Sequence, residues 1–259
     1  MGLSLILMII VNFLAVGLPL NNRSTASISD SYHVFFVPAG YVFSIWGLIY
    51  ITQIITYVRM FSQAKKYTEL INKITPLFIL GNIANAVWLF CWHYLQINLA
   101  VIVMLVLLVS LIYVYCTIKK YVTKDWMLTV PAGIYLGWIS VATIANISDA
   151  LYAANWDGLG IEPQIWAGIM IIVASFLAFF MVALKREFAY AAVIVWAIVG
   201  IAVKFPDEGT IVLAVLAGIA FILLAVLKIV STEGVVEKVK PVRSVSKKPS
   251  TKKVARKKY

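Results

Sequence analysis

The chain alternates between long apolar runs and short polar segments, and eight of the apolar runs are about as long as a bilayer is thick. These runs lack the alternation of a strand and predict transmembrane helices, because a helix satisfies its own backbone hydrogen bonds in lipid. We therefore predict an all-α integral membrane protein with about eight spans. The spans are Leu3–Leu20, Gly40–Phe61, Thr75–Leu95, Asn98–Ile118, Trp126–Ala153, Gln164–Leu184, Phe188–Val203 and Gly209–Val230.

The composition supports this class, because 63% of the residues are hydrophobic and the mean hydropathy is +0.95. The formal net charge of +11 would suit a nucleic-acid partner. Eleven of the 22 Lys and Arg residues, however, lie from Lys228 to the C-terminus, and most others lie in short loops. The charge therefore reports membrane orientation, and a nucleic-acid partner is not expected.

The basic residues also predict which helix ends face the cytoplasm. With a cytoplasmic N-terminus, 20 of the 22 fall in cytoplasmic loops or the tail, and only Arg23 and Lys204 fall outside. An even number of spans then places both termini in the cytoplasm, and we expect the plasma membrane. A cleaved signal peptide is the alternative for the first span, but that segment begins without Lys or Arg and its apolar run is longer than usual.

Two polar segments lie outside the predicted spans. Residues Asn21–Val37 either fold over the mouth of the bundle as a lid or form a flexible connector. The C-terminal segment 231–259 is basic, and its composition predicts disorder. This tail is expected to hold anionic lipid headgroups, at about 1 kcal/mol per basic residue near the surface.

Aromatic residues form a face on three of the predicted helices. Phe43, Trp46 and Tyr50 are spaced i, i+3 and i+7, so they share one side of the second helix. Such a face either anchors the helix at the interface or walls a pocket for a flat apolar ligand. Similar faces consist of Gly81, Asn85, Trp88 and Trp92 in the third helix and of Tyr135, Trp138, Ala142, Ala145 or Asn146, and Asp149 in the fifth.

Polar groups on these faces leave two interpretations open. Asn82 and Asn85 should face the protein, where they either orient a ligand or join helices through hydrogen bonds worth about 0.6–2 kcal/mol each. Small residues between the aromatic ones of the fifth helix leave a cleft or allow a tight helix contact. Asp149, toward the outer end, is expected to reach water.

The residues that usually carry catalysis or bind metals are few and scattered. Cys91 and Cys116 are far apart, and His33 and His93 are isolated, so the sequence indicates neither a disulfide nor a metal centre. No nucleophile–base pair is visible. We therefore expect no enzymatic activity and no obligatory cofactor.

Three motifs in the first 155 residues resemble the TspO/MBR family, the tryptophan-rich sensory proteins that include the translocator protein once called the peripheral benzodiazepine receptor. They are Pro38, Phe43, Trp46 and Tyr50; Asn85, Trp88 and Phe90; and Tyr135, Trp138, Ser140, Ala142, Thr143 and Asn146. The chain departs from the family in having Ile134 where a proline precedes the tyrosine, and in lacking the Trp-Tyr and Lys-Pro pairs of the first loop.

The resemblance implies a five-helix pocket that binds porphyrins, other tetrapyrroles, sterols or drug-like apolar molecules. The ligand-binding residues it implies are Phe43, Trp46, Tyr50, Asn85, Trp88, Trp92, Tyr135, Trp138, Ala142 and Asn146. A porphyrin or haem would then be a ligand, and a binding or sensory role is expected. A transporter and an enzyme acting on bound porphyrin are the alternatives, although no ionisable residue lies in the middle of a span.

The same resemblance predicts the organisation of the chain. Residues 1–155 would form a TspO-like five-helix domain, residues 156–230 a three-helix extension, and residues 231–259 the tail. Family members are often dimers, so a homodimer is a further expectation.

Overall fold

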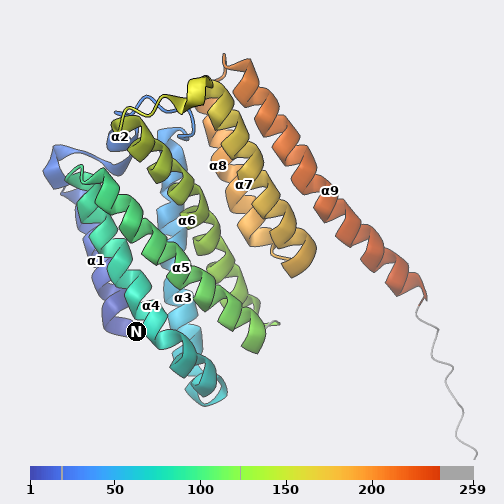
Figure 1. The fold of residues 1–259 in the computed structure, drawn as a ribbon. Helices are drawn as coiled ribbons and strands as arrows, with labels where there is room; N and C mark the ends of the chain where they lie inside the picture. Colours follow the sequence, from blue (N-terminus) through green and yellow to red (C-terminus); the bar gives the residue numbers. More distant parts are fainter. Residues whose placement is uncertain (19, 123, 240–259) are drawn as a thin grey trace, which may run out of the picture.

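The computed structural model describes residues 1–18, 20–122 and 124–239, and for residue 16 and residues 232–239 only the backbone is described. In these ranges the chain forms helices and no strand (Figure 1). The α-helices are α1 (Gly2–Gly17), α2 (Thr25–Ser29), α3 (Ile45–Ser62), α4 (Ala64–His93), α5 (Ile97–Tyr121), α6 (Trp126–Ala153), α7 (Pro163–Lys185), α8 (Phe188–Lys204) and α9 (Gly209–Val239). Short 3-10 helices are η1 (Leu20–Asn22), η2 (Gly40–Ser44) and η3 (Gly158–Gly160).

Within the described residues, every predicted span is helical over most of its length, which confirms the all-α membrane class. Six helical segments of the described chain are long and apolar enough to cross a membrane, counting η2 and α3 as one. The remaining two, α1 and α8, are apolar but have 16 and 17 residues. At 1.5 Å per residue they are about 25 Å long, slightly less than the hydrocarbon thickness of a typical bilayer.

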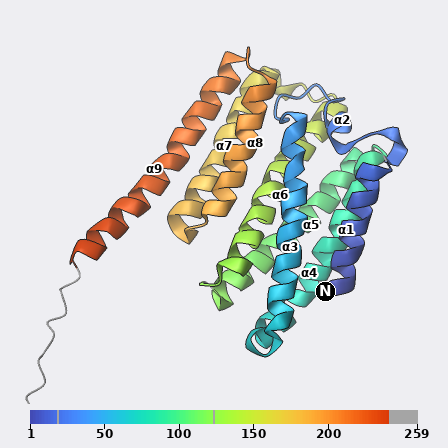
Figure 2. The same ribbon diagram turned by 180° about the vertical axis from the view of Figure 1, so that it is seen from behind.

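Helix α6 lies at the centre of the bundle. It packs against α3 and α5 on one side and against α8 on the other, and α8 in turn packs with α7 and α9 (Figures 1 and 2). Helix α4 lies between α1 and α5. The helices that the resemblance assigned to a five-helix unit therefore share a packed face with the three that follow.

Two helices are longer than the sequence predicted. Helix α4 begins at Ala64 instead of Thr75, because its first turns are amphipathic: Tyr67, Leu70 and Ile74 are buried while the intervening charged residues face outward. A search for wholly apolar runs misses such a segment. Helix α9 continues beyond Val230 to Val239, and residues 240–259 of the predicted tail lie outside the described residues.

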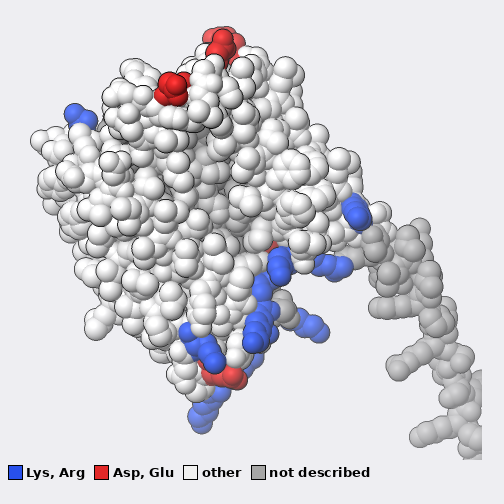
Figure 3. All heavy atoms as spheres, viewed as in Figure 1, with Lys and Arg blue, Asp and Glu red and all other residues white. Residues whose placement is uncertain are grey.

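The charged residues gather at the two ends of the bundle. Lys and Arg side chains cluster at the end opposite α2, whereas acidic residues are visible at the end that carries α2 (Figure 3). At the basic end, Asp125 accepts hydrogen bonds from Tyr67 and from Arg59, whose Nε and Nη2 are each 3.3 Å from Oδ2. Burial alone would raise the pKa of Asp125, but the Tyr67 hydrogen bond and the Arg59 charge outweigh it and lower this pKa.

A second ionic cluster joins three helices below the surface of the basic end. Glu187, which precedes α8, is only 3% exposed. Its Oε2 accepts hydrogen bonds from Lys119 Nζ at 2.8 Å and from the Tyr115 hydroxyl at 3.2 Å, both on α5. Gly133 of α6 lies so close that a Cβ placed there would be 2.5 Å from Glu187 Oε1. Any larger residue at this position would therefore force the Glu187 carboxylate to move.

Candidate functional site

The aromatic faces of α3, α4 and α6 meet inside the bundle, with Trp46 at the centre. The Trp46 ring stacks on Tyr50 with centroids 5.8 Å apart, and it lies 6.1 Å from the rings of both Trp88 and Trp138. Trp88 stacks on Trp92 in turn, at 5.9 Å. Three of these indoles are almost fully buried: Trp88, Trp92 and Trp138 are 2–3% exposed. They are core residues and do not form an interfacial belt.

A small cavity lies among these rings, with a volume of about 30 Å³. Its walls consist of Thr25, Ser29, Pro38, Phe43, Trp46, Trp88, Trp92, Trp138, Val141, Ala142, Ala145 and Asn146. Seven of the ten predicted ligand-binding residues are therefore brought together here. The space holds about one water molecule, so the rings fill the site by packing against one another.

The three other predicted residues take part in a hydrogen-bond network next to this cavity. Asn85, fully buried, accepts a hydrogen bond from Asn12 Nδ2 at 2.7 Å and donates to the Tyr135 hydroxyl at 3.0 Å. The Tyr50 hydroxyl donates to Asn12 Oδ1 at 2.6 Å. Asn85 thus joins α1, α4 and α6, which matches the helix-joining alternative raised for it.

Asn12 is the residue of this network that sequence reasoning missed. It is the only Asn, Gln or charged residue between Gly2 and Leu20 in the sequence, and it is buried in α1. A lone polar residue within an apolar span was the available signal, because such a residue needs a partner inside the protein.

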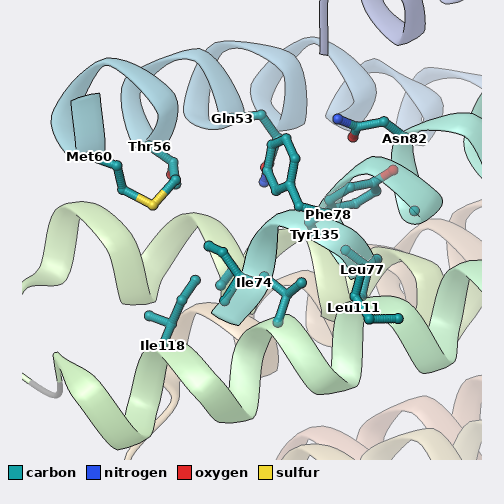
Figure 4. A pocket seen from close by; sticks show the side chains of 13 residues that line it. Gln53, Thr56, Met60, Ile74, Leu77, Phe78, Asn82, Leu111, Ile118 and Tyr135 are labelled. Atoms are coloured by element: carbon teal, nitrogen blue, oxygen red, sulfur yellow. The ribbon is translucent and has the colours of Figure 1, made fainter. Parts of the chain in front are cut away.

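Tyr135 also borders a second cavity of about 20 Å³ between α3, α4, α5 and α6. Figure 4 shows its wall, with Thr56 and Met60 of α3 at one end and Asn82 of α4 at the other. The space is mostly apolar and also holds about one water molecule.

Two of the indoles in the aromatic cavity differ in how their N–H groups are used. Trp88 Nε1 donates to Asn146 Oδ1 at 2.9 Å. Trp138 Nε1 is buried, and no acceptor for it is found among the described residues. A buried donor without an acceptor costs about 1–3 kcal/mol, so it calls for an explanation. One wall residue of the cavity, Trp138, therefore has a buried N–H with no acceptor in the described part of the chain.

The segment between α1 and α3 is folded over the end of the bundle. Trp92 Nε1 donates to the carbonyl of Thr25 at 3.2 Å. The His93 ring, fully buried, lies 3.0 Å from the Leu20 carbonyl and 3.2 Å from Thr25 Oγ1. Ser24 caps α2, whose Ile28 is fully buried. The lid interpretation of this segment fits these contacts, because Thr25 and Ser29 close one side of the aromatic cavity.

Asp149 was expected to reach water, and that expectation was wrong. Its side chain is fully buried, and neither carboxylate oxygen has a hydrogen-bond partner in the described part of the chain. The segment that follows α2 covers this end of α6. Burial, and then the nearby charge of Asp149, raises the pKa of Tyr32 in that segment.

These features define a multi-pass helical membrane protein with an aromatic cavity beneath a folded lid. A family model described as TSPO-like protein matches residues 1–229, and the chain belongs to this family. The match confirms the resemblance and extends past residue 155 through α7, α8 and most of α9. Membership makes the protein one of a family of membrane ligand-binding or sensory proteins. No curated protein and no solved structure matches the chain.

Proposed function

We propose that the protein binds a flat, largely apolar molecule, such as a porphyrin or another tetrapyrrole or a sterol, in the aromatic cavity between α3, α4 and α6. The observation that carries this proposal is the unpaired indole N–H of Trp138 in the cavity wall. A bound molecule with an acceptor atom would satisfy this donor, while the indole rings would stack on its flat surface.

A molecule of this size can bind only if the cavity opens. Ligand sites usually enclose about 300–1,000 Å³, whereas the cavity holds about 30 Å³. Three features favour opening at the lid: Trp46 and Phe43 are only half-buried, the 3-10 helix η2 leads into α3 at the entrance, and α2 is a helix of five residues. The described conformation is then the ligand-free, closed one.

The proposal includes an orientation. The clustering of basic side chains at the end opposite α2 supports a cytoplasmic location for that end and for both termini (Figure 3). The lid and the aromatic cavity would then lie near the outer surface of the plasma membrane.

A titration of the full chain in phosphatidylcholine nanodiscs with protoporphyrin IX and with cholesterol tests the proposal. We expect saturable quenching of tryptophan fluorescence with protoporphyrin IX, and displacement of that probe by cholesterol where the sterol occupies the same cavity. Trp138→Phe should weaken binding about 3- to 10-fold, the value of one hydrogen bond. The unfolding midpoint of the variant is measured separately to verify its fold, because removing an unpaired buried N–H favours the free protein while the smaller ring loses packing.

Trp126→Phe serves as the matched control, because Trp126 lies at the opposite end of α6 and is 68% exposed. Wild-type affinity in the Trp138 variant, or the absence of saturation with both ligands, would refute the proposal. Absorbance spectra of bound porphyrin, recorded in the dark and in light, would reveal any turnover.

A further inference from the structure

A second and much larger hollow lies outside the aromatic cavity, between α6 and α7 at the end that carries α2. Its volume is about 370 Å³, within the range of small-molecule sites. The segment His33–Phe36 lies along one side, and the connection from Trp156 to Ile161 lies along another. We call this hollow the α6–α7 groove.

The groove and the aromatic cavity use different faces of α6. The cavity is lined by Ala142 and Asn146, and the groove by Ile144, Ser148 and Leu151. The two share no lining residue, and the groove is more than ten times as large, at about 370 Å³ against 30 Å³. It is therefore a separate hollow from the site proposed above.

The mouth of the groove is held in place by specific contacts. Trp166 Nε1 donates to the carbonyl of Gly158 at 2.8 Å, and the Trp156 and Trp166 rings lie 5.3 Å apart. Gly158 has a φ of +65°, and a Cβ there would lie 3.3 Å from Trp166 Nε1. A glycine is needed for both reasons. Tryptophan is enriched at the boundary between lipid and water.

Polarity changes along the groove. The part of the groove between the two helices is apolar and is lined by Ile144 of α6 and by Ala167 and Met170 of α7. Its mouth carries the exposed carboxylate of Asp157, which accepts a hydrogen bond from the Leu159 N–H at 3.0 Å, and exposed Glu162 precedes α7 close by. No Lys or Arg lines the groove within the described ranges. A molecule that fits has an apolar body and a positively charged end.

We propose that the α6–α7 groove binds a long-chain amine from the adjoining membrane leaflet, with its ammonium group at Asp157 and its chain between α6 and α7. The lining residues of α6 are spaced along two turns of the helix, about 12 Å, which provides a channel for an extended chain. The partly exposed Ile147, Leu151 and Tyr152 leave the groove accessible from the lipid side.

The test uses the full chain in phosphatidylcholine vesicles and three probes: hexadecylamine, hexadecanol and hexadecanoic acid, each with a nitroxide on the chain. The fluorescence of Trp156 is obtained by subtracting the fluorescence of Trp156→Phe from that of the wild type. We expect the amine to quench this signal saturably. Its half-saturating concentration should be about 3-fold lower than that of the alcohol, as for an exposed ion pair. Hexadecanoic acid should bind more weakly than the alcohol.

Three variants localise the effect. Ser148→Phe fills the groove and should weaken amine binding at least about 5-fold, the loss of roughly 1 kcal/mol of apolar contact. Ile165→Phe is the matched control, because Ile165 is exposed on α7 and does not line the groove. Asp157→Asn keeps the backbone cap but removes the charge, so the preference for the amine over the alcohol should disappear.

Several results would overturn the proposal. One is quenching of Trp156 that rises linearly with probe concentration, as expected for exposed Trp126 at the other end of α6. Equal affinity for the three headgroups would refute the amine assignment. An undiminished affinity in Ser148→Phe, with the fold verified by its unfolding midpoint, would place the amine elsewhere. Trp138→Phe should leave amine binding unchanged, which separates this proposal from the preceding one.

Discussion

The buried ionic cluster of Glu187, Lys119 and Tyr115 predicts an unequal response to the loss of its two charges. Among the described residues, Lys119→Ala leaves the carboxylate of Glu187, 3% exposed, with only the Tyr115 hydrogen bond. Breaking a buried pair in this way costs about 3–5 kcal/mol. Glu187→Ala instead leaves the Lys119 side chain, which is 20% exposed and can extend to water. We expect that loss to be smaller, about 1–3 kcal/mol.

The double variant distinguishes this account from a simple loss of packing. With both charges removed, neither is left buried without its partner, so the cost should be less than the sum of the single losses by about 1–3 kcal/mol. The free energy of unfolding can be measured in mixed detergent micelles by titration with a denaturing detergent. Lys120→Ala is the matched control, because Lys120 lies beside Lys119 in sequence but is exposed, with its ammonium 5.8 Å from the centroid of the Tyr121 ring.

The reasoning would be refuted if the two single variants lost equal stability or if the double variant showed additive losses. The same titration tests the predicted division between residues 1–155 and 156–230. Glu187 belongs to the second segment, whereas Lys119 and Tyr115 belong to the first. A single cooperative transition that shifts as a whole in the Glu187 variant would argue for one folding unit.

Three further predictions concern single buried groups. Because the folded-state pKa of Asp125 lies below its ordinary value of 3.8, its carboxylate stabilises the fold above that pH, and this contribution is lost as the pH falls through the folded-state pKa. Unfolding midpoints measured from pH 7 to 3 should therefore fall less steeply in Asp125→Asn, and an unchanged slope would contradict this. Asp149→Leu should raise the free energy of unfolding by about 1–3 kcal/mol, since it removes a buried carboxyl that has no hydrogen-bond partner among the described residues; destabilisation would show that the group has a partner in the membrane. Asn85→Leu should lower it by about 1–3 kcal/mol through two lost hydrogen bonds, and Ile83→Leu, at an exposed position of the same helix, should not.

The sequence predicted the helices well where periodicity and hydrophobicity act together, as in α5 and α7. It also identified the faces that meet inside the bundle, because a spacing of three and four residues fixes the side of a helix. It did not predict which polar groups would pair. Asn85 could equally have faced a ligand, and the choice depended on Asn12, 73 residues away. Such pairing depends on how distant helices come together, which no local pattern encodes.

The position of α6 suggests how the two proposed sites could influence each other. The segment between α1 and α3 contributes Thr25 and Ser29 to the aromatic cavity and His33 and Phe36 to the groove. A ligand that pushes this segment away from the cavity would therefore have to shift it against the groove. Since Tyr32 lies between Trp92 and Tyr152, with ring centroids 6.4 and 6.3 Å away, the two walls are in contact through one side chain. Coupling between the sites would then be reciprocal: an amine that holds this segment in place would weaken porphyrin binding by the same factor by which porphyrin weakens binding of the amine.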